Sequence, residues 1–422
     1  MRAHTVVIGG GVMGVSIALH LARRLDPLSQ PVVLLEKSRL AAGSSGRSGA
    51  ILRQHYSSTA LAGMARDSLK VYSSFRRMTG RSIGFQKTGV LILARSPEDV
   101  AMVRANVERM RELGIETSLI DTDEIRARVP GIEVDEDTLG AWEPSAGTVD
   151  PHMTVEGFAE LAKSHGATTR IGLGAQGLRV EEGRIVGVDT SEGPIEAQHV
   201  VVAAGPWTGR LLATIGVELP LRVVRPLQHF VEMPPAPLGA VTASAVTDEE
   251  SIDPELAEKL GPVEEPPPAA HPVILDFANG MYIRCDSEHG RTRIGDMDTS
   301  TDDGVDDPDR LDESVDEEFR AWARRTAVER MPVYRNSGDL DPLAGIYTMT
   351  PDDQAVIGKL PDVRGLVVAS GFSGHGFKLA PSIGEGVAQL VLGEPVSAYD
   401  TTVFEPMRFA ERAVVTGRGF GL

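Results

Sequence analysis

The first forty residues show three apolar patterns in succession. Residues 5–9, TVVIG, form an uninterrupted apolar run that is typical of a buried parallel strand. Residues 12–24 carry apolar side chains at helical spacing, and a second strand-like run, PVVLLEK, covers 31–37. The chain is therefore predicted to begin with a strand, a helix and a second strand.

Strand-like and helix-like patterns continue along the chain. From residue 184 the sequence alternates like a hairpin and then becomes the apolar run VVVAAG at 200–205. Because that run is typical of a buried strand, we expect it to rejoin the first sheet and make that domain discontinuous. Other expected elements are a strand pair over 84–93, a helix over 97–114, a strand and turn over 139–151, a helix over 151–165 and a helix over about 313–330.

Two segments differ from these patterns in composition. Residues 234–272 are rich in proline and acidic residues, with one short helical piece at 253–261. We interpret this region as an exposed excursion, with partner binding as the alternative. A second acidic run, over 296–318, lacks the ligand spacing of a calcium loop and is interpreted as a solvated face.

A glycine-rich turn separates the first strand from the first helix. Gly9 suits a tight turn, Gly11 would let the backbone approach a pyrophosphate, and Gly14 would let the helix pack closely on the strand. The helix N-terminus favours phosphate, and Glu36, at the end of the next strand, would accept the ribose hydroxyls. The whole unit predicts dinucleotide binding, with a purely structural turn as the alternative.

Composition narrows the class of protein. With 422 residues, of which 41% are hydrophobic, the chain is long enough for two domains. A net charge of −18 opposes nucleic acid and anionic membranes as partners. The single cysteine, Cys285, excludes an intramolecular disulfide and any cysteine-based metal centre, and no metal site is predicted. No apolar run could span a membrane, no signal peptide is recognised, and we expect a cytoplasmic protein.

Several motifs together resemble one family. They are GSSGRSGAILRQHY (43–56), GTVDP (147–151), VVVAAGPWT (200–208), YTMTPDDQAVIG (347–358) and GFSGHGFKLAPSIGE (371–385). In this order they are similar to the D-amino-acid oxidase and sarcosine oxidase superfamily, whose members bind FAD. The resemblance covers nearly the whole chain.

The resemblance implies an α/β plus α+β fold with two domains. A discontinuous Rossmann-like FAD-binding domain would comprise 1–83, 145–220 and 340–422. A smaller substrate domain, 84–144 and 221–339, would place an antiparallel sheet over the flavin. The resemblance also implies a set of cofactor-binding residues: Gly9, Gly11, Val12, Met13, Gly14, Glu36, Lys37, Ser44, Ser45, Arg47, Ser48, Gly49, Ala50, Val180, Ala204, Gly205, Trp207, Gly345, Gly371, Gly374, His375, Gly376, Phe377 and Lys378.

The family's substrate residues map onto three positions. Arg53 and Lys378 match the two cations that hold the substrate carboxylate in monomeric sarcosine oxidase, and Tyr347 matches a pocket tyrosine. The alternatives are a local salt bridge for Arg53, a phosphate or flavin-carbonyl contact for Lys378, and a core position for Tyr347. His375 would line the flavin or simply pack.

Departures from the family pattern bear on the chemistry. Gly345 stands where monomeric sarcosine oxidases carry the cysteine that tethers FAD, and Arg47 where dimethylglycine dehydrogenases carry a tethering histidine. The resemblance therefore implies non-covalent FAD. Arg293 stands at the place of the family's oxygen-activating lysine, which leaves the electron acceptor open between O₂ and another molecule. His152 lies next to the position that tethers a second flavin in some relatives, and a second flavin is not predicted.

The expected function is oxidation of an amino acid at its C–N bond by hydride transfer to FAD, giving an imine that water hydrolyses. A secondary amino acid similar to sarcosine or proline is the favoured small-molecule substrate. The alternatives are a D-amino-acid dehydrogenase, a biosynthetic amine-desaturating flavoenzyme, or a β-type subunit of a hetero-oligomeric sarcosine oxidase or amino-acid dehydrogenase. No folate-binding C-terminal domain is recognised, which speaks against a full-length dimethylglycine dehydrogenase arrangement. The oligomeric state is left open.

Overall fold

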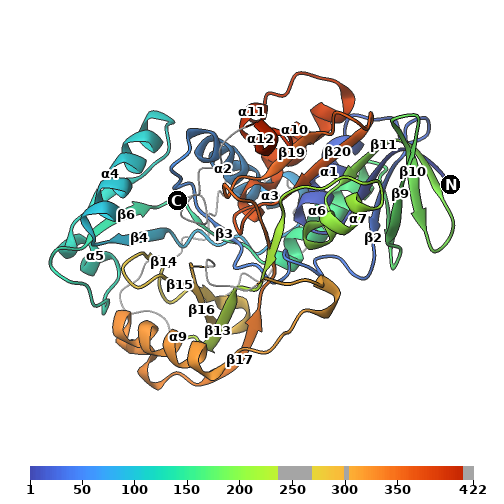
Figure 1. The fold of residues 1–422 in the computed structure, drawn as a ribbon. Coiled ribbons are helices and arrows are strands. Elements are labelled where there is room, and N and C mark those ends of the chain that lie inside the picture. Colours follow the sequence, from blue (N-terminus) through green and yellow to red (C-terminus); the bar gives the residue numbers. More distant parts are fainter. Residues whose placement is uncertain (236–268, 299–303, 412–422) are drawn as a thin grey trace.

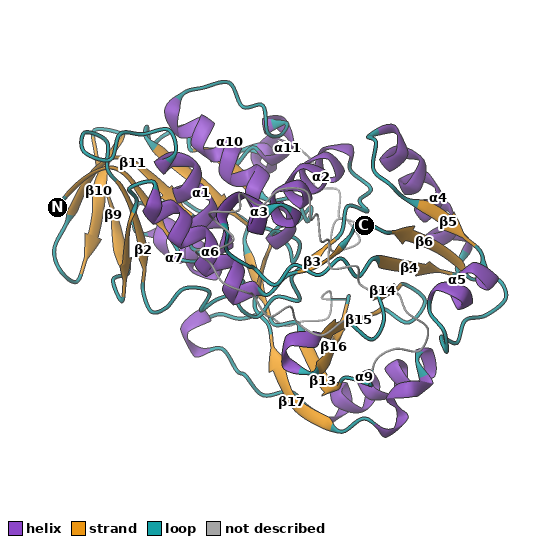
Figure 2. Ribbon diagram, turned by 180° about the vertical axis from the view of Figure 1, so that it is seen from behind, coloured by secondary structure: helices purple, strands orange, loops and turns teal. Residues whose placement is uncertain are grey.

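The computed structural model describes residues 1–235, 269–298 and 304–411 and arranges them around two eight-stranded sheets (Figures 1 and 2). In the first sheet the strands from β20 to β8 run parallel, and β19 is antiparallel at the edge. In order, its strands are β19 (Val356–Lys359), β20 (Leu366–Ser370), β11 (Ile195–Val202), β1 (Arg2–Ile8), β2 (Val32–Glu36) and β8 (Thr168–Ile171), with β10 (Arg184–Thr190) and β9 (Ala175–Glu181) attached beside β11.

The predicted strand–helix–strand unit is confirmed as β1, α1 (Val12–Ala22) and β2. Both strands are apolar on both faces because both faces are covered. Val7 and Leu34 face the core that includes α1, whereas Val6 and Leu35 face a second core. The two-residue period of the strands thus accounts for the uninterrupted apolar runs in the sequence.

Strand β11 confirms the predicted change from hairpin to buried strand. Its first residues pair antiparallel with β10 and alternate between buried and exposed positions. Its last residues, Val200–Val202, lie between β1 and β20 in parallel pairing. Segments that are far apart in the sequence therefore share the first sheet.

The second sheet is antiparallel except at one place, where β14 and β4 pair in parallel. The resemblance implies an antiparallel sheet, and the parallel pairing of β14 with β4 corrects this expectation for one pair of strands. In order, its strands are β17 (Asp339–Ala344), β13 (Leu227–Glu232), β16 (Arg291–Asp296), β15 (Met281–Asp286), β14 (Val273–Asp276), β4 (Val90–Ala94), β6 (Leu139–Glu143) and β5 (Ser118–Ile120).

The strand pair predicted over 84–93 is wrong in its first half. Only β4 is a strand, and Gln86 makes a single bridge to Thr148. Gly84 and Gly89 both have positive φ, at 66° and 72°, which takes the backbone out of the extended conformation on either side of this bridge.

The two faces of the second sheet have different neighbours. Ile274 and Ile283 pack on the side of α5 (Thr122–Arg128) and α9 (Glu317–Arg330). Leu275 and Tyr282, one residue away along the same strands, belong to the core shared with the first sheet. Alternation along β14 and β15 thus directs one set of side chains towards the interior of the molecule.

The remaining helices surround these sheets (Figure 1). The helices expected over 97–114, 151–165 and 313–330 are confirmed within a few residues as α4 (Pro97–Glu112), α6 (Pro151–Ser164) and α9. The piece predicted at 253–261, like most of 234–272, lies outside the described residues. The further helices are α2 (Thr59–Ser73), α3 (Phe75–Thr79), α4 (Pro97–Glu112), α6 (Pro151–Ser164), α7 (Thr208–Ala213), α10 (Ala380–Leu392), α11 (Thr401–Phe404) and α12 (Arg408–Glu411).

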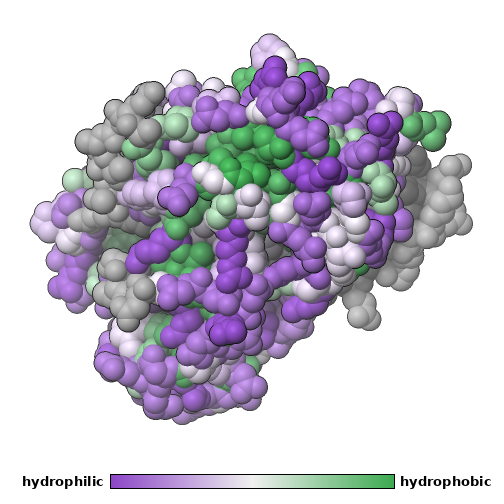
Figure 3. Space-filling model, turned by 45° about the vertical axis from the view of Figure 1, so that its right-hand side comes forward, coloured by the Kyte–Doolittle hydropathy of each residue, from purple (hydrophilic) through white to green (hydrophobic). Residues whose placement is uncertain are grey.

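Two short ribbons are separate from the two large sheets. β3 (Ile51–Leu52) pairs with β7 (Gly147–Thr148), and β12 (Arg222–Val224) pairs with β18 (Tyr347–Met349). The face in Figure 3 is mostly hydrophilic, as expected for a chain with 24% charged residues, and its hydrophobic residues gather mainly near the upper centre. In the described ranges, every helix is too short or too polar to cross a membrane.

Candidate active site

The main cavity opens at the carboxyl ends of the central strands of the first sheet. Its volume is about 370 Å³, and Ile8, Glu36 and Ala203, at or just beyond the ends of β1, β2 and β11, are among its lining residues. Ligands of open α/β sheets bind at this edge. Predicted cofactor residues that line it are Gly9, Gly11, Val12, Met13, Glu36, Lys37, Ser44, Ser45, Ser48, Ala204, Gly205, Trp207, Gly371, Gly374, Gly376 and Phe377.

The glycine turn leaves no space for side chains. A Cβ on Gly9, whose φ is 118°, would collide with the Ala203 carbonyl oxygen, and a Cβ on Gly14 would collide with the Gly9 carbonyl oxygen. Gly14 therefore serves close packing of α1 on the turn and does not line the cavity. Gly11 brings no side chain to the start of α1, so the positive end of the helix faces the cavity.

Glu36 holds the turn while it lines the cavity. One carboxylate oxygen accepts the Gly10 N–H at 2.8 Å and the other accepts the Ser38 N–H at 2.8 Å. The side chain is buried, and the oxygen that accepts the Ser38 N–H also accepts the Ser38 hydroxyl at 3.3 Å, so the oxygen that accepts the Gly10 N–H keeps a further lone pair. This arrangement fits a carboxylate that receives hydroxyl groups of a nucleoside.

Charged residues gather at one side of this cavity. The Lys37 ammonium lies 3.8 Å from the centre of the Trp207 ring and pairs with Asp309. Asp309 also accepts from the Trp207 indole and from Arg210, each at 2.9 Å. Sequence reasoning missed Arg210 and Asp309, because Asp309 belongs to the acidic run that was interpreted only as a solvated face.

A smaller cavity, of about 60 Å³, adjoins the first. Ser48, Tyr347, Gly374 and Phe377 line both cavities, so the two meet at these residues. The other residues that line the smaller cavity are Gly49, Ala50, Ile51, Arg53, Leu275, Tyr282, Met297 and Lys378. The predicted residues Arg53, Tyr347 and Lys378 are therefore brought together, and Leu275, Tyr282 and Met297 are additions that the sequence did not reveal.

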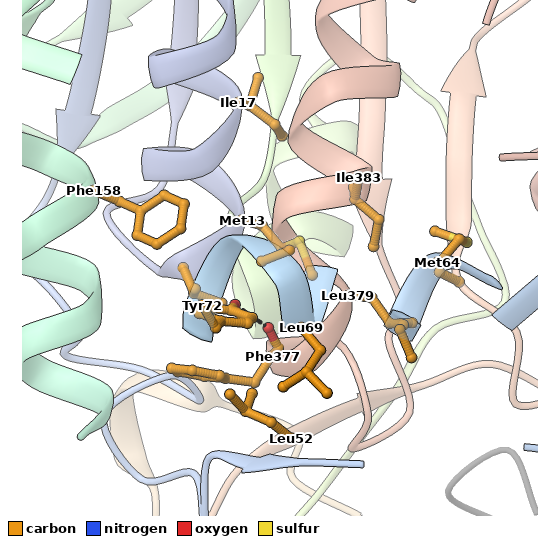
Figure 4. Packing of buried hydrophobic residues seen from close by; sticks show 14 of the residues in the cluster. Met13, Ile17, Leu52, Met64, Leu69, Tyr72, Phe158, Phe377, Leu379 and Ile383 are labelled. Atoms are coloured by element: carbon orange, nitrogen blue, oxygen red, sulfur yellow. Dashed lines mark hydrogen bonds between the residues drawn. The ribbon is translucent and has the colours of Figure 1, made fainter. Parts of the chain in front are cut away.

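Lys378 is a buried cation. It directly follows Phe377, whose carbonyl accepts the Tyr72 hydroxyl at 2.6 Å, so α2 anchors the loop that carries it (Figure 4). Burial, and then the charge of Arg53, lower the pKa of Lys378 well below its usual value. Within the described part of the chain no carboxylate pairs with Lys378. An unpaired buried ammonium indicates a binding site for an anion.

Arg53 lies just beyond β3 and is also buried. Its guanidinium stacks over the Tyr56 ring at 4.4 Å and donates to the His55 carbonyl. The Lys378 ammonium lies 6.0 Å from the centre of the same ring. Two cations therefore share one wall of the smaller cavity.

Five predicted residues besides Gly14 line neither cavity. Val180 pairs with Ile185 and packs against the second core, and Gln176, earlier on β9, lines the main cavity. Arg47 pairs with Glu313. The other residues outside the cavities are Gly345, His375 and Arg293.

These three residues are held by contacts within the protein. Gly345 donates its N–H to the Pro226 carbonyl at 2.7 Å. His375 donates to the Asp353 carbonyl at 2.9 Å, and burial lowers the pKa of its imidazole to about 3, which keeps the ring neutral. Arg293 donates to the Arg47 carbonyl at 2.9 Å and to Gln228.

Cys285 lies on the face of β15 that is turned away from the cavities. It alternates with Tyr282 and Arg284 and packs near Tyr334, on the side of α9. The thiol is buried, as predicted for a small apolar residue. In the three described ranges no three His, Cys, Asp or Glu side chains gather as a site for a metal ion.

The main cavity fits a dinucleotide. Its glycine turn brings backbone without side chains to the cavity wall, its helix N-terminus suits phosphate, and Glu36 suits a ribose. Of known proteins, human dimethylglycine dehydrogenase is 27% identical over 97% of this chain, and human peroxisomal sarcosine oxidase is 25% identical over 96% of this chain and 95% of its own length. The chain spans only 45% of the dimethylglycine dehydrogenase.

Solved structures have a similar fold. The L-proline dehydrogenase of P. horikoshii superposes with a TM-score of 0.82 at 26% identity, covering 98% of this chain and 99% of that protein. The family model described as FAD dependent oxidoreductase, or DAO, matches residues 4–390. The chain therefore belongs to the DAO family of FAD-dependent oxidoreductases.

Proposed function

We propose that this enzyme oxidises the C–N bond of an amino acid, with a secondary amino acid similar to sarcosine or proline as the favoured substrate. The observation that carries the proposal is the pair of buried cations, Arg53 and Lys378, in a small cavity that adjoins the dinucleotide cavity. A carboxylate is the anion that an amino acid would present to such a pair of cations. The names of the similar proteins, which act on dimethylglycine, sarcosine and proline, support the same class of substrate.

Bound FAD supplies the oxidant, because it accepts a hydride equivalent from the substrate carbon. The protein positions that carbon. Arg53 and Lys378 would hold the carboxylate, and the apolar side chains of Leu275 and Met297 would exclude water from the remainder of the cavity. The amine nitrogen provides the electron pair of the new C=N bond, and water then hydrolyses the imine to a carbonyl compound and an amine.

Tyr347 lines the cavity at the junction with the main cavity. Burial raises the pKa of its hydroxyl above the usual value, so the group stays protonated and can donate a hydrogen bond to the substrate. Non-covalent FAD is part of this proposal, because Gly345 and Arg47 bring neither a thiol nor an imidazole to the positions of the family's tethers.

The test is anaerobic reduction of the bound FAD. The purified yellow protein is mixed with sarcosine, proline, glycine, dimethylglycine and a set of D-amino acids, and loss of the visible flavin band is followed. Each compound that reduces the flavin is paired with its carboxamide, which keeps the amine and removes the carboxylate. Reduction by the acid and not by the amide is expected. Equal reduction by both would refute the role of the two cations, and preference for D-amino acids would favour the alternative D-amino-acid dehydrogenase.

A further inference from the structure

Glu143 is a buried carboxylate for which the proposed reaction has no role. It is the last residue of β6, and its side chain is fully buried. One oxygen accepts the Gln54 N–H at 2.9 Å, whereas the other, Oε1, has no hydrogen-bond partner among the described residues. A buried carboxylate oxygen without a partner is costly, so its presence calls for a functional explanation.

Glu143 lines neither cavity but is close enough to Arg53 for the two charges to interact. Its Gln54 partner adjoins Arg53, and the charges of Arg53 and Glu143 both act on the buried Tyr56 hydroxyl. That hydroxyl has no hydrogen-bond partner in the described residues. The Tyr56 ring is the one over which Arg53 stacks at 4.4 Å and near which Lys378 lies at 6.0 Å. One carboxylate and two cations are therefore buried around the same ring.

We propose that Glu143 is the internal counter-ion of the substrate-carboxylate site: it balances Arg53 when the site is empty and takes up a proton when a carboxylate binds. This inference rests on the proposed function, because it requires the carboxylate to bind at Arg53 and Lys378. Glu143 would then be a positioning residue, because it acts on the substrate only through Arg53. Its role would be to keep the empty site close to neutral and yet release the cations to an incoming anion.

The neighbouring groups restrict which protons can move. Burial raises the pKa of the Glu143 carboxyl to about 7, although the N–H groups of Gln54 and His55 and the charge of Arg53 lower it in part. Burial lowers the pKa of His55 and of His375 to about 3, so both rings stay neutral near pH 7. Burial also raises the pKa of Tyr56 to about 12.

Arg109 is a third cation in the surroundings, and Lys378 can also titrate. From α4, Arg109 acts on His55 and holds Asn106, whose amide contacts the His55 ring at 3.2 Å. Lys378, in the short turn before α10, has a lowered pKa and can also gain a proton when an anion binds. Glu143 is thus the group around this site whose protonation an incoming carboxylate would change near pH 7, and protonation of Lys378 would change in the same direction.

The direction in which pH changes ligand binding follows from the change in the pKa of Glu143 on binding. A bound anion disfavours the ionised form of Glu143, so its pKa is higher in the complex than in the empty site. Binding then takes up a proton, and the dissociation constant rises by up to about tenfold per pH unit as the pH increases above about 7. Proton uptake by Lys378 would change the dissociation constant in the same direction, so variants are needed to separate the contributions of Glu143 and Lys378.

The experiment uses the FAD-loaded protein and cyclopentanecarboxylate, an acid without an amine that cannot be oxidised at a C–N bond. Its dissociation constant is measured from the change in the flavin spectrum across neutral and mildly alkaline pH. Proton uptake is measured by calorimetry in two buffers of different ionisation enthalpy. Glu143→Gln keeps an acceptor for the Gln54 N–H and removes the charge, and Lys378→Met is the matched variant.

In Glu143→Gln we expect proton uptake to decrease and binding at pH 8 to be tighter than in wild type by up to about tenfold. Lys378→Met should bind more weakly but keep the rise of the dissociation constant above about pH 7, and the double variant should lose the pH dependence. A purely structural role of Glu143 would weaken binding equally at every pH. Unchanged proton uptake in Glu143→Gln would overturn the inference.

A measurement on the wild type covers the case in which Glu143→Gln does not fold. Infrared difference spectra, with and without the acid, should show a new protonated-carboxyl band of the protein on binding, separable from the ligand by isotopic labelling of the ligand carboxyl group. Absence of that band would overturn the inference. If the proposed function itself were wrong, the acid would not perturb the flavin spectrum at any pH in any variant, which distinguishes that outcome from failure of the inference about Glu143.

Discussion

Replacement of Lys378 by methionine is expected to stabilise the protein and to weaken its substrate binding. In the empty site the ammonium is buried, is close to Arg53 and pairs with no carboxylate among the described residues. Because folding lowers the pKa of this lysine, the folded state disfavours its charge, and this penalty is present below the usual lysine pKa of 10.5. Methionine keeps the apolar stem and removes the penalty.

The effect on binding has the opposite sign. The variant loses one charge-assisted hydrogen bond to the carboxylate, worth about 1.5–3 kcal/mol, which corresponds to a rise of roughly 10- to 100-fold in the dissociation constant. In the wild type, part of the energy gained from this hydrogen bond is used to protonate the Lys378 amine, and this cost grows as the pH rises. We therefore expect the lower end of this range near pH 10 and the upper end near pH 6.

Two assays test these expectations. Thermal unfolding of the FAD-loaded protein should give a higher midpoint for Lys378→Met than for wild type, with a larger difference at about pH 6 than at about pH 10. Anaerobic titration with the amino acid and with its amide should show that the variant has lost most of its preference for the acid. Lys163→Met, on the exposed surface of α6, is the control and should change neither. A variant that is less stable and binds the acid as well as wild type would show that Lys378 serves the fold or the cofactor.

Three further predictions concern the cofactor and the fold. Glu36→Ala should weaken FAD binding by about 1.5–3 kcal/mol, and unchanged affinity in titrations of the apoprotein would place the ribose elsewhere. Acid denaturation should release all FAD into the supernatant, because Gly345 and Arg47 cannot form a covalent link; yellow precipitate would contradict this. Asp276→Ala should lower the free energy of unfolding by about 3–5 kcal/mol in urea titrations, because Asp276 is fully buried and pairs with Arg330 at 2.8 Å; a loss below 1 kcal/mol, roughly the value of an exposed pair, would contradict it.

The features that could be predicted from the sequence are those encoded within short segments. The turn at Gly9, Gly11 and Gly14 depends on local backbone geometry, and the change of pairing along β11 is visible as a change from alternating to continuous apolar residues. The failure at 84–93 has the same origin, because the positive φ of Gly84 and Gly89 outweighs the strand propensity of their neighbours.

Other features depend on contacts between distant segments. Asp309 reaches Lys37 from more than 270 positions away, and Tyr282 enters the smaller cavity only because β15 stands in the middle of the second sheet. Glu143 lies in the motif GAWEPSAG, where nothing local distinguishes a buried carboxylate from an exposed one. Such positions need the tertiary structure.

The origin of the residues around the smaller cavity has a consequence for how this enzyme can change. Arg53, Tyr347 and Lys378 come from segments attached to the cofactor part, whereas Leu275, Tyr282 and Met297 come from β14, β15 and the turn after β16. Under the proposed function, the carboxylate that all amino acids share would thus be recognised by one set of residues and the side chain that distinguishes them by the other. A library restricted to Leu275, Tyr282 and Met297 would then vary the substrate while keeping the carboxylate site, and exchange of this sheet between relatives would be the same change on a larger scale.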